Sequence, residues 1–85
     1  MRWIVIVAKP AQKQAAEFPA KDQNRIGAAI RSISVDPFSG DVLKLEGQGN
    51  RWHRRVGSYR IFFAADNAAK TVAISAILRR TSSTY

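Results

Sequence analysis

Residues 52–61 read Trp-His-Arg-Arg-Val-Gly-Ser-Tyr-Arg-Ile, and this stretch decides the fold of the C-terminal half of the chain. Runs that contain aromatic and β-branched residues flank Gly57-Ser58, and a two-residue connection with glycine first is typical of a tight β-hairpin. A turn at these two residues fixes which residues lie opposite each other on the two strands. The predicted cross-strand pairs are Val56 with Tyr59, Arg55 with Arg60, Arg54 with Ile61, His53 with Phe62 and Trp52 with Phe63.

The two faces of this hairpin differ in chemistry, because side chains alternate between faces along a strand. His53, Arg55 and Arg60 share one face. Arg54 is the one charged residue on the other face, where its stem can be buried while its head reaches the edge of the sheet. The remaining residues of that second face, which we expect to face the core, are Trp52, Val56, Tyr59, Ile61 and Phe63.

The predicted pair of Arg55 and Arg60 places two positive charges directly opposite each other, which destabilises a sheet. The sequence has no acid between Glu46 and Asp66 to compensate them. This face therefore predicts a site that binds an anion of about the size of a phosphate group. Two alternatives stay open: the guanidinium groups extend into water, or they form ion pairs across space with Asp36, Asp41 or Glu46.

His53 is the only histidine of the chain, and it shares the face of the two arginines. Nearby positive charge disfavours the imidazolium form, so we expect a lowered pKa for His53. A neutral imidazole at pH 7 can accept a proton, as a general base must. The alternative is an ordinary packing or solvated histidine on a strand.

The rest of the chain predicts one α+β domain over residues 1–85, with the element order β-α-α-β-β-β-β. Two helices, one from Pro10 and one from Ala20, are predicted by apolar residues at helical spacing and by Pro19 and Asp36-Pro37 after them. We expect them to pack as a helical hairpin on one face of a mostly antiparallel sheet, which ends in a four-strand meander. The predicted strands are Arg2–Ala8, which we expect to be buried, Val42–Glu46, Trp52–Val56, Tyr59–Ala65 and Thr71–Leu78.

Composition limits the classes of function. The chain carries a formal net charge of +8, and residues 51–85 contribute +6 of it, from seven basic side chains and Asp66 alone. This asymmetry favours a polyanionic or acidic partner. With no cysteine, one histidine and six acids, we expect neither a metal site nor a cofactor. The apolar run from Trp3 to Ala8 is too short to span a membrane.

The pattern Trp52-x-x-Arg55-Val56-Gly57-x-Tyr59-Arg60-Ile61, followed by an apolar strand and then Arg79-Arg80-Thr81-Ser82-Ser83-Thr84-Tyr85, resembles the RelE/ParE superfamily of toxins from toxin–antitoxin pairs. The length and the element order resemble that family over the whole chain. Members of the RelE branch cut mRNA in the ribosomal A site, whereas members of the ParE branch inhibit DNA gyrase and lack the catalytic residues.

The resemblance to the RelE branch implies roles for particular residues. It implies that His53 is a candidate general base, that Arg79 stabilises the transition state or donates a proton, and that Tyr85 stacks on an unpaired base. The best-known members carry lysines where this chain has His53 and Arg55, so the identity of the base stays open. The implied catalytic set is His53, Arg55, Arg60, Arg79 and Tyr85, with Arg55 and Arg60 as phosphate clamps, and the further RNA-binding residues are Lys44, Arg51, Arg54 and Arg80.

The resemblance also implies a cytoplasmic location and three partners: a cognate antitoxin protein, the ribosome and mRNA. An antitoxin can neutralise such a toxin by covering the Arg55 and Arg60 face or by displacing the segment that bears Tyr85, and the sequence leaves both open. It also leaves open the oligomeric state, a higher-order toxin–antitoxin complex included. Two other functions remain as alternatives: a ParE-type gyrase inhibitor without nuclease activity, and an RNA-binding module that cuts nothing.

Overall fold

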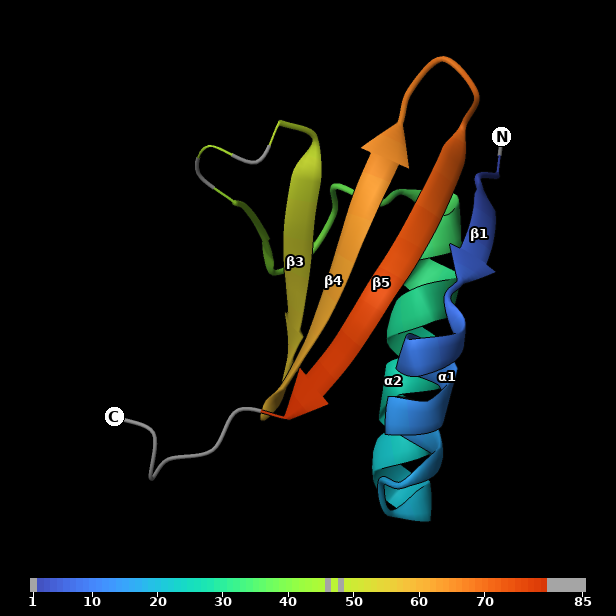
Figure 1. The fold of residues 1–85 in the computed structure, drawn as a ribbon, viewed down its shortest axis with the longest axis vertical. Coiled ribbons are helices and arrows are strands. Elements are labelled where there is room, and N and C mark those ends of the chain that lie inside the picture. The colour runs from blue at the N-terminus through green and yellow to red at the C-terminus, as the bar shows by residue number, and fades with distance from the viewer. Residues whose placement is uncertain (1, 46, 48, 80–85) are drawn as a thin grey trace.

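The structure is a computed structural model that describes residues 2–45, 47 and 49–79. Within these residues, two helices and five strands follow one another in the predicted order β-α-α-β-β-β-β (Figure 1). The elements are β1 (Ile4–Val7), α1 (Lys9–Ala16), α2 (Ala20–Val35), β2 (Val42–Lys44), β3 (Arg51–Val56), β4 (Tyr59–Asp66) and β5 (Thr71–Arg79).

The strands form one sheet in the order β1-β5-β4-β3-β2. The four strands β2 to β5 make the predicted antiparallel meander, and β1 adds to its β5 edge in the parallel direction. The two helices lie side by side on one face of this sheet (Figure 1). We call the opposite face, which neither α1 nor α2 covers, the outer face. The predicted α+β architecture is confirmed.

The hairpin of β3 and β4 has the predicted register at all five cross-strand pairs, from Val56 with Tyr59 to Trp52 with Phe63. Gly57 adopts a positive φ of 56° at the first turn position, a conformation that glycine adopts without strain. The turn residues therefore set the register, and the register sets the two faces of the hairpin.

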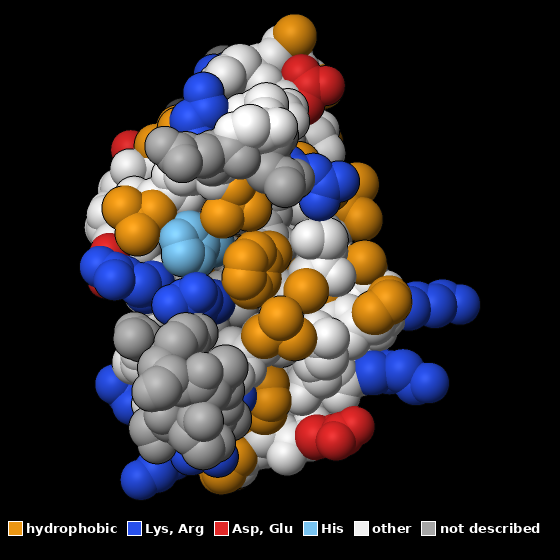
Figure 2. Space-filling view, turned by 60° about the vertical axis from the view of Figure 1, so that its left-hand side comes forward, with side chains coloured by type: hydrophobic (Ala, Val, Ile, Leu, Met, Phe, Trp, Pro, Cys, Tyr) orange, Lys and Arg blue, Asp and Glu red, His pale blue; other side chains and the backbone are white. Residues whose placement is uncertain are grey.

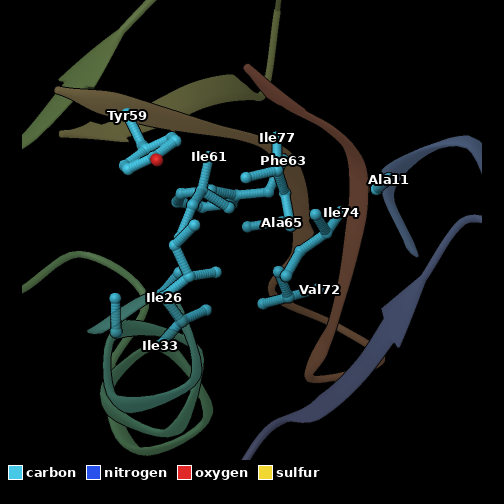
Figure 3. Packing of buried hydrophobic residues seen from close by; sticks show 11 residues of the cluster. Ala11, Ile26, Ile33, Tyr59, Ile61, Phe63, Ala65, Val72, Ile74 and Ile77 are labelled. Atoms are coloured by element: carbon cyan, nitrogen blue, oxygen red, sulfur yellow. The ribbon is translucent and has the colours of Figure 1, made fainter. Parts of the chain in front are cut away.

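The core lies between α2 and the inner face of the sheet (Figure 3). Ile26, Ala29 and Ile33 recur at helical spacing on α2 and are buried. Alternate residues of β4 point toward them, because a strand covered on one face buries every second side chain. The buried residues of β4 are Tyr59, Ile61, Phe63 and Ala65.

The N-terminal strand differs from the prediction of a buried strand over Arg2–Ala8. It is shorter, and Ile4 and Ile6 remain 63% and 56% exposed. The reason is that β1 is an edge strand with helices on one side only. Val5 and Val7 face that side and pack against the core, whereas Ile4 and Ile6 lie on the outer face.

A β-bulge interrupts the pairing of β4 with β5. Phe63 pairs with Ile74, but the preceding residue Phe62 pairs with Ala76, which leaves Ser75 as an extra residue on β5. An extra residue reverses the alternation of side chains beyond it. Ile77 therefore faces the core after Ile74, three positions rather than two further along the strand.

Candidate nucleic-acid interface

The predicted anion site lies on the outer face of the sheet, near the turn between β3 and β4. Arg55 of β3 lies directly opposite Arg60 of β4, and His53 lies opposite Phe62 in the next pair on the same face. We call His53, Arg55 and Arg60 the basic cluster. Figure 2 shows the part of the histidine that is visible from outside, between Lys and Arg side chains and a strip of hydrophobic ones. The prediction that these three residues share one face is confirmed.

Arg55 has a carboxylate partner, so for this arginine the alternative of an ion pair with Asp41 holds, and the expectation of an uncompensated charge does not. Its Nε and Nη2 atoms donate to the two carboxylate oxygens of Asp41, each at 3.0 Å. Asp41 directly precedes β2, and its backbone oxygen accepts a hydrogen bond from the backbone N–H of Arg55. This partner raises the pKa of Arg55, mainly through the side-chain hydrogen bond. The pair reduces the repulsion between Arg55 and Arg60 and keeps Arg55 oriented on the outer face.

Arg60 has no such partner among the residues that the structure describes, where the pair of Arg55 and Asp41 is the one salt bridge. The Nε atom of Arg60 is buried and has no hydrogen-bond acceptor within residues 2–45, 47 and 49–79. A buried donor without an acceptor is costly, and its free energy improves when a ligand supplies one. Arg60 is therefore the residue of the basic cluster that is best placed to bind an anion.

His53 is almost fully buried, with 8% of its surface exposed. Its ring stacks on Phe62 with 5.6 Å between the centroids, and its Nδ1 atom is buried without a hydrogen-bond partner in the described part of the chain. Burial lowers the pKa of His53, and the positive charges of Arg60 and Arg55 lower it further. The predicted direction is confirmed, but the larger cause is desolvation rather than the arginines. His53 therefore favours its neutral form.

One of the other predicted catalytic residues, Arg79, starts on the opposite face of the sheet from the basic cluster. Arg79 pairs with Tyr59, so its side chain starts on the face that the helices cover, and its charge acts on the pKa of Tyr59. The bulge at Ser75 causes this, because unbroken alternation from Ile74 would place Arg79 on the outer face. Arg79 and Arg60 therefore start on opposite faces of the sheet, and the catalytic role of Arg79 stays a prediction.

Two predicted RNA-binding residues also lie on the helix-covered side of the sheet. Arg54 is half-buried, and its guanidinium group packs beside Gly40 and donates to the backbone oxygen of Ser39 at 3.5 Å. Lys44 pairs with Trp52, and its ammonium group lies 5.8 Å from the centre of the Trp52 ring. These contacts give both side chains a structural role.

The remaining three predictions have different outcomes. Arg51 is exposed on β3, on the same face as His53 and Arg55. It therefore extends the positive charge of the outer face. Arg80 and Tyr85 lie outside the described residues, so their roles stay predictions.

A groove that no sequence signal indicated borders the basic cluster on the outer face. We call it the Phe62 groove, and its volume is about 290 Å³. It lies beside the bulge, which brings Ser75 and Ala76 to the same side of β5. Small side chains at these positions leave space between larger ones. The groove is lined, among others, by Leu45, Arg51, Phe62, Ser75, Ala76 and Leu78.

A second feature that sequence reasoning missed anchors the hairpin to α2. The hydroxyl of Tyr59 donates a hydrogen bond of 2.7 Å to the Asp22 carboxylate. This bond raises the pKa of Tyr59. The two residues are 37 positions apart, so only the packing of α2 against the sheet brings them together.

Neither a metal site nor a membrane-spanning helix is found in the part of the chain that the structure describes. No group of three or more His, Cys, Asp or Glu side chains there could hold a metal ion. No helix among the same residues is long and apolar enough to cross a membrane.

Comparison with known proteins identifies the fold. No family model and no curated protein sequence matches the chain. Solved structures do match, and three of them are as follows. The RelE–RelB complex from Pyrococcus horikoshii has a TM-score of 0.83 at 24% identity, over 96% of this chain and 99% of that one. The RelBE2 toxin–antitoxin complex from Mycobacterium tuberculosis has a TM-score of 0.82 at 20% identity, over 94% and 100%. A YoeB/ParE toxin from Agrobacterium tumefaciens has a TM-score of 0.77 at 15% identity, over 92% and 99%.

Fold and site together define a class: a small basic α+β domain with two helices on one face of the sheet and a cationic cluster on the other. The structural matches place this domain more narrowly, because they cover nearly the whole of both chains. The chain has the fold of the RelE/ParE superfamily of toxins, as the resemblance in the hairpin sequence predicted.

Proposed function

We propose that this chain is the toxin of a toxin–antitoxin pair and that it cuts mRNA on the ribosome. The observation that carries the proposal is Arg60, a cation without a carboxylate partner among the described residues, beside the buried imidazole of His53. An anionic ligand supplies what this cluster lacks. The RelE-type fold supports the same reading, since the matching structures include RelE toxins with their RelB antitoxins.

The chemistry of RNA cleavage suits these residue types. The 2′-oxygen of a ribose attacks the adjacent phosphorus, the bond to the 5′-oxygen breaks, and negative charge develops on the phosphorane between them. Arg60 donates to the phosphate oxygens and stabilises this charge, because guanidinium groups bind phosphate with two hydrogen bonds and do not lose their proton. His53 takes the proton of the 2′-hydroxyl in its neutral form. The 5′-oxygen takes its proton from water.

Arg55 has a secondary part in this proposal, because Asp41 already binds it. It adds positive charge next to Arg60 and contacts phosphate only where the ligand competes with Asp41. Arg79 is left out of the catalytic step, since its side chain starts on the opposite face of the sheet.

A cognate antitoxin is the partner that this function needs in the cell. The outer face combines exposed apolar residues, such as Leu43 and Leu78, with the positive charge of the basic cluster. An acidic segment with apolar side chains would bind both features and keep RNA away from Arg60.

The test is induced expression of the chain, followed by primer extension on two reporter mRNAs that differ only in a start codon. The proposal expects growth arrest and cuts in the translated reporter alone. The Arg60→Ala variant should lose the cuts, whereas Arg31→Ala, which removes an exposed arginine of α2, should keep them. Cuts that persist in Arg60→Ala would remove the basic cluster from the mechanism.

A ParE-type gyrase inhibitor is the second candidate, and one observation favours it. The cations of the predicted catalytic set are divided between the two faces of the sheet, with Arg79 apart from Arg60. The likeness to a YoeB/ParE toxin is compatible with this reading. Inhibition of purified gyrase by the chain, with no cuts in either reporter, would favour this candidate over the nuclease.

A further inference from the structure

The Phe62 groove and the basic cluster form one continuous surface. Arg60 and Phe62 are two positions apart on β4 and point to the same face, so their Cα atoms lie about 7 Å apart. The cross-strand partner of Arg60 on β5 is Leu78, which lines the groove. On the neighbouring strand β3, His53 lies opposite Phe62, and its ring stacks on the Phe62 ring. A ligand held at Arg60 therefore has the groove directly beside it.

The groove suits a flat, uncharged ring. Its volume of about 290 Å³ is just below the range of roughly 300–1,000 Å³ for pockets of drug-sized ligands, which leaves room for a single ring system. Its walls are the aromatic ring of Phe62 and the aliphatic side chains of Leu45 and Leu78. Among the described residues, no acidic side chain lines it, so none of these residues favours a cationic ligand.

Two polar groups at the groove match the edge of a nucleobase. Ser75 is exposed and its hydroxyl makes one long hydrogen bond, 3.4 Å to the backbone oxygen of Phe62. That hydroxyl can still bond to a ligand. Arg51 belongs to the same lining, and a guanidinium group can stack on a base or bond to its edge. The bulge at Ser75 creates this arrangement, and bulges commonly occur next to functional sites.

We propose that the Phe62 groove is a nucleobase subsite, which holds the base of the nucleotide whose phosphate binds Arg60. This proposal rests on the proposed function, since it assumes that the outer face binds RNA. It adds a determinant of substrate choice: the base is recognised by stacking and shape beside the phosphate clamp. A groove of this size accepts a base without reading its full hydrogen-bonding edge, so we expect a modest preference among bases.

The test compares two single-stranded probes with equal charge: a six-residue adenosine oligoribonucleotide and the same backbone without bases. We expect the wild-type chain to bind the probe with bases at least about 5-fold more tightly, the effect of stacking one base. Ala76→Leu fills the groove and should remove this preference, while binding to the base-free backbone stays unchanged. Ala73→Leu is the matched control, because Ala73 is exposed on the same strand and face but lies outside the groove lining.

The remaining outcomes separate the two proposals. If Ala76→Leu still prefers the probe with bases, the Phe62 groove does not hold the base. The groove would then be a site for an apolar side chain of a protein partner. Equal binding of both probes by the wild-type chain overturns the groove assignment too, without the use of any variant. In either case, weaker RNA binding by Arg60→Ala still supports the proposed function. If Arg60→Ala binds both probes as the wild-type chain does, the proposed function fails and the subsite fails with it.

Discussion

Replacing Asp41 with asparagine should weaken the fold and strengthen RNA binding. Two nitrogen atoms of Arg55 donate to the Asp41 carboxylate, each at 3.0 Å. Asparagine has nearly the same shape as aspartate but carries no negative charge, so this charged acceptor is lost. Without the Asp41 carboxylate, the repulsion between the positive charges of Arg55 and Arg60 is no longer reduced, so we expect a lower melting temperature. The same change frees Arg55 to bind a phosphate group. A structural role alone would change stability and leave RNA affinity as it was.

The size of the gain follows from counterion release. One more phosphate contact adds about 0.7 to the slope of log affinity against log salt for single strands. If the wild-type chain and the Asp41→Asn variant bind RNA equally near 1 M salt, the variant binds about 8-fold more tightly than the wild type at about 50 mM salt and about 3-fold more tightly at about 200 mM. The gain must therefore shrink as salt rises.

Fluorescence anisotropy with a labelled single-stranded RNA, repeated over this range of salt, measures both affinity and slope. Asp66→Asn is the control, because it makes the same change of charge at the far end of β4, where its side chain accepts hydrogen bonds from the turn. Unchanged affinity in Asp41→Asn, or an equal gain in Asp66→Asn, would refute the claim that Arg55 faces the ligand.

Three further predictions concern the fold and the histidine. Ile61→Ala should lower the free energy of unfolding by about 2–5 kcal/mol in urea titrations, because Ile61 is 0% exposed, whereas Ile4→Ala on the open edge should change it by less than about 0.5 kcal/mol. Gly40→Ala should lower the melting temperature, since a Cβ there would lie 2.9 Å from the Cζ atom of Arg54 at a backbone φ of +81°; an unchanged melting temperature contradicts this. The pKa of His53 should lie below its usual value of 6.5 in an NMR titration. Because the unfolded chain then binds the proton more readily, stability should fall as the pH drops below about 6.5, and this loss should be absent in His53→Gln.

Much of the fold could be predicted from local sequence signals. Gly57-Ser58 between two strand-like runs set the hairpin register, and every predicted pair is present. The apolar spacing of Ile26, Ala29 and Ile33 identified the inner side of α2. These signals are reliable because turn geometry and side-chain periodicity act over a few residues.

The candidate site was predictable only in part. The common face of His53, Arg55 and Arg60 follows from alternation along one hairpin. The partner of Arg55 does not, because Asp41 is 14 residues away and joins it only when β2 pairs with β3. The same holds for the burial of His53, which depends on Phe62 and on neighbouring strands.

By itself, the sequence determined the hairpin, the order of the elements and the face on which the basic cluster lies, since each depends on neighbours along the chain. Only the tertiary structure decided which arginine pairs with Asp41 and on which face Arg79 starts. The physical reason is that one extra residue, Ser75, reverses the alternation of β5, and its place is set by packing against β4 rather than by any local signal.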